Sequence, residues 1–114
     1  MRVSNLLTSA ALAAGFFIAQ GSAFAADAQK GKAAYAKHGC WQCHGYVGQG
    51  GAGPKLAPEP MPLAAMVPFL RHTNGAMPPY MEPVLSDADI ADIQAYLASI
   101  PKPADYKSIP LLNK

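Results

Sequence analysis

Two cysteines and a histidine stand close together in the segment Cys40-Trp41-Gln42-Cys43-His44. The pattern Cys-x-x-Cys-His is typical of covalent attachment of a c-type haem. Each thiol can form a thioether with one haem vinyl group, and the adjacent imidazole can then bind the iron as proximal ligand. The segment therefore predicts one haem c, attached through Cys40 and Cys43, with His44 as an iron ligand.

The same cysteine pair has other possible uses, as a redox dithiol, half of a zinc site or a short disulfide. A thioredoxin-like dithiol needs a βαβ setting, which this sequence does not show. A zinc site needs two more ligands, for which only His38 and His72 remain. Haem attachment is favoured over all three.

We expect a second axial iron ligand, opposite His44, among the methionines and histidines that follow this motif. We prefer Met77, because Gly75 and the two prolines after Met77 predict a stiff, non-helical loop that can present its sulfur. A methionine in an apolar chain is by default packing material, which is our interpretation of Met61, Met66 and Met81. His72 is the rival ligand, and it would give bis-histidine ligation and a lower reduction potential.

The N-terminal segment predicts export. Arg2 gives a positive start, residues 6–19 form an apolar run, and Ala23-Phe24-Ala25 has the small-x-small form of a cleavage site. The alternative is a membrane anchor, but the run is shorter than the roughly 20 residues that a spanning helix needs. We expect a signal peptide, 1–25, and a periplasmic mature protein with no stable membrane span and no disulfide.

The remainder is long enough for one small domain, which we place at 26–101, followed by a C-terminal tail, 102–114. The formal net charge of the whole chain is +2, and Arg2 supplies one of these charges. A nearly neutral mature chain is not expected to bind nucleic acid. A core of this size would be marginally stable alone, and a bound haem would supply the missing apolar mass.

A first helix is expected over residues 27–37. Asp27 can cap it, alanines favour it, and Gly39 can end it just before the haem motif. Gly31 and Tyr35 lie four residues apart on one face, so a second helix can approach closely at the glycine. Three lysines on this segment are more typical of a solvated face than of a docking patch.

The best-defined helix follows Ser86, which can cap it, and it stops before Pro101. Its apolar residues share one face, which we expect to cross the first helix at Gly31 and Tyr35. They are Ile90, Ile93, Leu97 and Ile100, with Tyr96 beside them.

Between these helices, five of the nine residues from 45 to 53 are glycine, so the backbone can pass close to a flat ligand. Tyr46 lies in this run and is an expected haem contact. The carbonyl of Pro54 can accept the second N–H of the His44 imidazole, although an ordinary turn has the same sequence.

A further helix is expected over 63–72, where Pro68 would kink it or mark a second start. The fork of donors on Arg71, near its end, suits a haem propionate, although a solvent-exposed arginine fits equally well. The tail ends in the apolar tip Ile109-Pro110-Leu111-Leu112, which has no obvious place in so small a core. We expect this tip to dock on a partner.

The chain resembles the class I c-type cytochromes over essentially the whole mature sequence. The resemblance rests on several motifs in the family's order: Gly31 with Tyr35, the segment 40–44, Gly-Pro-x-Leu at 53–56, Met77-Pro78, and Tyr96-Leu97. It implies an all-α, small cytochrome c fold of three to four helices around one haem. It also implies His44 and Met77 as axial ligands, with the Pro54 carbonyl on His44. Pro68 departs from the pattern, since a helix is usual there.

The function implied by this resemblance is one-electron transfer, without catalysis by the protein itself. The section from Arg71 to Tyr96 looks like the small cytochromes that serve periplasmic dehydrogenases. A dehydrogenase is thus the expected donor, and another cytochrome or a terminal oxidase the expected acceptor. The alternatives are a haem enzyme or gas sensor with a labile sixth ligand, and a haem-free dithiol protein.

Overall fold

The computed structural model describes residues 25–113, so the predicted signal peptide lies outside the described part except for its last residue. Four α-helices follow one another: α1 (Ala28–Lys37), α2 (Trp41–His44), α3 (Leu63–Arg71) and α4 (Asp87–Ser99). Two short 3-10 helices, η1 (Tyr106–Ser108) and η2 (Pro110–Leu112), lie in the tail. The described residues contain no strand, so the all-α fold class is confirmed.

Helices α1 and α4 begin where their capping residues predict. The Asp27 carboxylate accepts hydrogen bonds from the backbone N–H groups of Gln29 and Lys30, at 2.8 and 3.2 Å. The Ser86 hydroxyl accepts from the backbone N–H of Asp89 at 3.1 Å. Each cap satisfies N–H groups that have no partner inside the helix.

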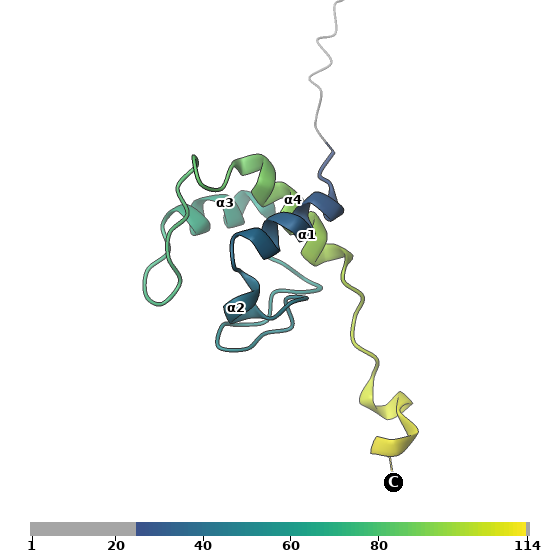
Figure 1. Cartoon of the computed structure of the whole chain (residues 1–114). Helices are drawn as coiled ribbons and strands as arrows, with labels where there is room; N and C mark the ends of the chain where they lie inside the picture. Colours follow the sequence, from purple (N-terminus) through teal and green to yellow (C-terminus); the bar gives the residue numbers. More distant parts are fainter. Residues whose placement is uncertain (1–24, 114) are drawn as a thin grey trace, which may run out of the picture.

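The two helices cross at a glycine, as predicted. A Cβ built on Gly31 would lie 1.8 Å from the backbone oxygen of Asp92 in α4, so only glycine allows this approach. Beside the crossing, the rings of Tyr35 and Tyr96 pack with their centroids 5.6 Å apart. This crossing is visible at the centre of Figure 1.

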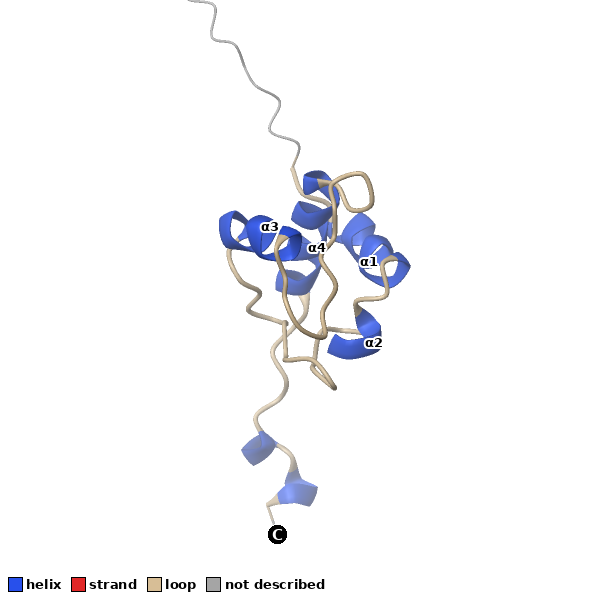
Figure 2. Cartoon of the chain, turned by 90° about the vertical axis from the view of Figure 1, so that its left-hand side faces the viewer, coloured by secondary structure: helices blue, strands red, loops and turns tan. Residues whose placement is uncertain are grey.

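Helix α3 runs over nine residues with Pro68 inside it. The proline did not divide the segment into two helices, although its ring nitrogen cannot donate the usual hydrogen bond. Helix α3 lies beside α4 in both views (Figures 1 and 2) and buries Met66 in the core.

The core is small and is built mainly on the α1 and α4 crossing. Nine hydrophobic residues are buried: Ala34, Tyr35, Ala57, Met66, Leu85, Ile90, Ile93, Tyr96 and Leu97. The tail takes no part in it, and η1 and η2 lie away from the four helices in both views (Figures 1 and 2). Leu111 and Leu112 are 75% and 63% exposed.

Candidate haem site

The two cysteines and His44 are brought together by α2, a single helical turn. Gly39, with φ of +73°, turns the chain from the end of α1 into α2. Cys40 directly precedes the helix, and Cys43 and His44 are its last two residues. Residues three and four apart share a helix face, so both thiols and the imidazole lie on one side. Both cysteines are free thiols.

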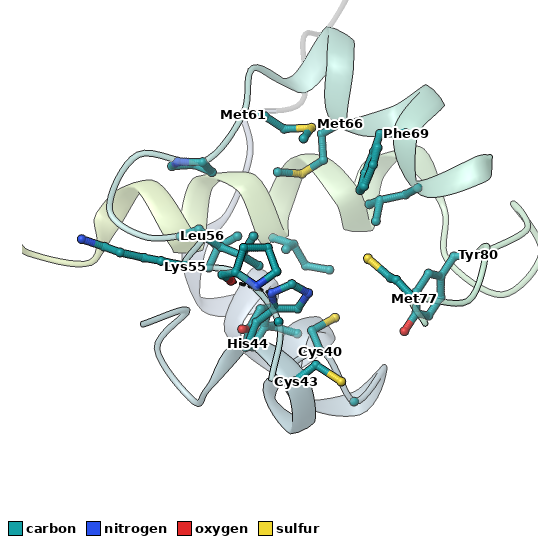
Figure 3. A pocket seen from close by; sticks show the side chains of 18 of the residues that line it. Cys40, Cys43, His44, Lys55, Leu56, Met61, Met66, Phe69, Met77 and Tyr80 are labelled. Carbon is teal, nitrogen blue, oxygen red and sulfur yellow. Dashed lines mark hydrogen bonds between the residues drawn. The ribbon is translucent and has the colours of Figure 1, made fainter. Parts of the chain in front are cut away.

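This face borders an apolar cavity of about 680 Å³, which is within the usual size range of cofactor sites. The cavity is walled by α2, the glycine-rich loop, α3, the segment before α4, and α4 itself. Besides both cysteines and His44, its lining includes Tyr35, Pro54, Lys55, Leu56, Met61, Met66, Phe69, Leu70, Met77, Tyr80, Leu85, Ile93 and Leu97. In Figure 3 the sulfurs of Cys40 and Cys43 lie beside the His44 ring at this cavity.

The His44 imidazole is buried and is held in one orientation. Its Nδ1 lies 2.8 Å from the carbonyl oxygen of Pro54, the contact expected from the sequence. Because a carbonyl can only accept, Nδ1 carries the proton, and the lone pair of Nε2 is free to bind a metal. Gly53 packs against the ring, since a Cβ there would lie 2.8 Å from Cε1.

The glycine-rich loop is fixed to the haem motif and to the core. Its backbone N–H groups at Gly50 and Gly53 donate to the carbonyls of His44 and Cys43, both at 2.8 Å. From the core, the Tyr35 hydroxyl donates to the Gly45 carbonyl at 2.8 Å. Burial raises the pKa of Tyr35 to about 12, so this hydroxyl stays a donor at any physiological pH.

A second core tyrosine makes the matching bond one residue further along the loop. The Tyr96 hydroxyl donates to the Tyr46 carbonyl at 3.0 Å. The two tyrosines that pack at the α1 and α4 crossing therefore also set the position of the chain leaving His44. The sequence predicted that both rings pack at the helix crossing, but not that their hydroxyls form hydrogen bonds to the loop.

Met77 lies on the loop between α3 and α4 and lines the cavity. In Figure 3 its sulfur points into the cavity from a different wall than the one that carries His44. Met81 is 61% exposed and does not line the cavity. Met61 and Met66 line the cavity as Met77 does, and Met66 is also buried in the core. His72, the rival ligand, is exposed and is absent from the cavity wall.

Residues 26–97 match the sequence model of a family described as "Cytochrome C oxidase, cbb3-type, subunit III". The chain belongs to this family. It is a class I c-type cytochrome, as its motifs predicted. No curated protein and no solved structure matches the chain.

Membership of the family implies haem c, and the cavity of this cytochrome fits that group. Two thiols and an imidazole with a free Nε2 share one wall, methionine thioethers that include Met77 lie on other walls, and the rest of the lining is mainly apolar. Gly53 leaves the His44 ring in place, because any side chain there would lie within 3 Å of the imidazole. Cys40, Cys43, His44 and Met77 would hold the haem.

Two predicted haem contacts of the cytochrome are not brought to the cavity. The Arg71 guanidinium donates to the Tyr80 carbonyl at 2.8 Å and pairs with the Asp87 carboxylate. The Tyr46 ring is 67% exposed and stacks on Trp41, with the centroids 4.6 Å apart. Both side chains have partners elsewhere, so their predicted contact with haem is not supported.

Phe69, Leu70 and Tyr80 are among the cavity residues that were not predicted as haem contacts. Phe69 and Leu70 belong to the apolar stretch of α3, and Tyr80 follows the Met77-Pro78-Pro79 segment that was singled out. Their apolar character could be read from the sequence. That they face one cavity depends on how α3 packs on α4.

None of the helices within residues 25–113 has the length and hydrophobicity of a membrane span.

Proposed function

We propose that this cytochrome is a one-electron carrier with a single haem c, attached through Cys40 and Cys43 and held axially by His44 and Met77. Haem c supplies an iron that exchanges one electron between Fe(III) and Fe(II). The observation that carries the proposal is the donor set of the cavity: two thiols and an oriented imidazole on one wall, and methionine thioethers on others, of which Met77 is the one on the non-helical loop before α4.

The protein's own groups would set the conditions for that exchange. The Pro54 carbonyl keeps the proton on Nδ1 of His44 and so presents a neutral Nε2 donor. The Met77 thioether is also neutral and is a weak donor, which favours Fe(II) and raises the reduction potential. Apolar side chains such as Leu56, Leu70 and Ile93 keep water away from both donors. With two axial positions occupied, no substrate would bind at the iron.

The test is the absorption spectrum of the purified cytochrome and of its Met77→Ala variant. We expect a low-spin spectrum with the weak long-wavelength sulfur-to-iron band, and a covalent haem mass on the denatured chain. Met77→Ala should lose that band, bind CO readily and show a markedly lower potential, because the thioether donor is gone.

Met81→Ala is the matched control, since Met81 is exposed and lies outside the cavity wall. It should leave the spectrum unchanged. A high-spin wild-type spectrum with rapid CO or peroxide binding would instead indicate a haem enzyme or gas sensor. A chain without covalent haem would contradict the whole assignment.

The proposal also covers the cellular location of the cytochrome and its redox partners. The predicted signal peptide supports export to the periplasm, with a periplasmic dehydrogenase as donor and another cytochrome or a terminal oxidase as acceptor. The family description names an oxidase subunit, which supports a respiratory acceptor. An intact mass of the periplasmic protein that begins at Ala26 would support the predicted cleavage, and a retained leader would contradict it.

A further inference from the structure

The loop that carries Met77 has few constraints of its own within the described part of the chain. We define the Met77 loop as residues 73–79, which are non-helical. Among the described residues, no hydrogen bond involves a donor or acceptor of this loop, and the Thr73 hydroxyl is buried without a partner. A Cβ on Gly75 would meet nothing within 4 Å, so the tip of the loop is open. The position of Met77 must therefore be set largely from the two ends of the loop.

The C-terminal end of the loop is fastened at Tyr80, the third residue after Met77. Its backbone N–H donates to the Leu70 carbonyl at 2.8 Å. Its carbonyl accepts from Arg71 at 2.8 Å, and its hydroxyl donates to the His38 carbonyl at 3.2 Å. Tyr80 is thus tied to the end of α3 and to the residue that closes α1, just before the haem motif.

Arg71 connects Tyr80 to a third element, helix α4. One of its terminal nitrogens donates to the Tyr80 carbonyl, and the other pairs with Asp87 in the first turn of α4. The Arg71 side chain is only 14% exposed, so little water competes for its donors. The guanidinium fork is planar and rigid, and a lysine could reach one of these partners but not both.

We propose that Arg71 is a positioning residue for the axial methionine, holding the Met77 loop closed through Tyr80 and Asp87. The inference rests on the proposed ligation of iron by Met77. Arg71 does not line the cavity, so its effect is exerted through the Tyr80 carbonyl. Without this bond the loop would open more often and leave the sixth position to an external ligand.

The experiment measures how tightly the ferric holo-cytochrome binds added imidazole, which competes with the methionine sulfur. Arg71→Met keeps an apolar stem and removes all donors. It should bind imidazole about tenfold more tightly and weaken the sulfur-to-iron band, because a hydrogen bond from a charged donor is lost. Asp87→Asn keeps the bond to Tyr80 and should give a smaller increase.

Lys102→Met is the matched control. Lys102 also forms an ion pair, with Glu59 at 2.7 Å, but both partners are about three-quarters exposed and far from the Met77 loop in sequence. It removes the same charge and should bind imidazole as the wild type does. If Arg71→Met does not accumulate as folded protein, Arg71→Lys carries the test with an expected increase of at least about twofold.

An unchanged imidazole affinity in the folded Arg71 variants would overturn the proposal. So would an altered potential with unchanged affinity, because that result would place Arg71 at a haem propionate. Failure of the proposed ligation has a different signature: the wild type would lack the sulfur-to-iron band, and Met77→Ala would bind imidazole with wild-type affinity. That result would overturn both proposals.

Discussion

At the scale of single residues, the orientation of His44 depends on two neighbours in the glycine-rich loop. The Pro54 carbonyl holds Nδ1, and Gly53 lies flat against the ring because it has no side chain. A hydrogen-bonded partner of this kind fixes ring orientation and raises the basicity of the metal-binding nitrogen. The two contacts are made by adjacent residues, Gly53 and Pro54.

Gly53→Ala is therefore predicted to disturb the axial histidine. The added methyl would lie 2.8 to 3.2 Å from three ring atoms of His44, so the ring must shift away from Pro54. We expect a loss of stability of about 1 to 3 kcal/mol and a higher reduction potential, because the imidazole becomes a weaker donor. Urea unfolding and redox titration of the holo-protein measure the two effects.

The control for this variant is Val47→Ile, which adds one methyl group at an exposed position of the same loop, outside the cavity wall. It should change neither the potential nor the stability by a measurable amount. A Gly53→Ala protein with wild-type potential would show that the ring does not depend on this close contact.

At the scale of elements, the crossing of α1 and α4 supports both the core and the haem site. Gly31 allows the two backbones to meet, and the adjacent tyrosines reach from the crossing to the loop after His44. A change at the crossing should therefore reach the site through Tyr35 and Tyr96.

Gly31→Ala should be strongly destabilising. Its methyl would overlap the Asp92 carbonyl, and backbone cannot move aside as a flexible side chain can. We expect a loss of about 3 kcal/mol or more in the free energy of unfolding, at the upper end of overpacking effects, despite alanine's better helix propensity. Denaturant unfolding of the holo-protein measures it.

Lys32→Ala provides the comparison, because it introduces the same residue at the next, exposed position of α1. Its stability should stay within about 0.5 kcal/mol of the wild type. Equal stabilities for the two variants would mean that the helices can separate at the crossing without cost.

At the scale of the whole molecule, four helices and their loops surround one cavity, while the tail lies apart. Nine buried hydrophobic residues make a small core, and the cavity lies directly beside it. Lys102, at the start of the tail, pairs with Glu59 on the cavity side, where the partner holds the pKa of the Glu59 carboxyl below its usual value. Beyond Lys102 the tail's own contacts are local, within residues 105–113.

Ending the chain after Lys102 should leave the folded domain intact. The Glu59 pair is kept, and the removed residues contribute nothing to the buried core. We expect the free energy of unfolding to change by less than about 0.5 kcal/mol, measured by urea titration of the holo-protein. A loss well above that would mean that the tail packs on the helices.

The same truncation bears on the predicted docking of the apolar tip, which stays a prediction. If Leu111 and Leu112 contact a redox partner, the truncated cytochrome should accept electrons from that partner more slowly while its own potential is unchanged. An unchanged rate would exclude the docking role.

The haem motif, the helix ends and the Gly31 crossing could all be predicted from the sequence, because each depends on a few adjacent residues or on one helical face. Asp27, Ser86 and Gly39 act within a single turn, and the bond from His44 to Pro54 spans only ten residues. Pro68 was the exception within a helix, because packing of α3 on α4 outweighed the missing hydrogen bond.

Which side chains face the cavity, and which have partners elsewhere, depends on how the helices and loops pack and could not be predicted from the sequence. Arg71 was a reasonable propionate partner by chemistry, but Tyr80 and Asp87 come together beside it in space and take both of its terminal nitrogens. The exposed Tyr46 ring stacks on Trp41. These contacts join residues that are distant in the chain. Several partners of similar chemistry are possible for each side chain, and the tertiary geometry determines which of them lies within reach.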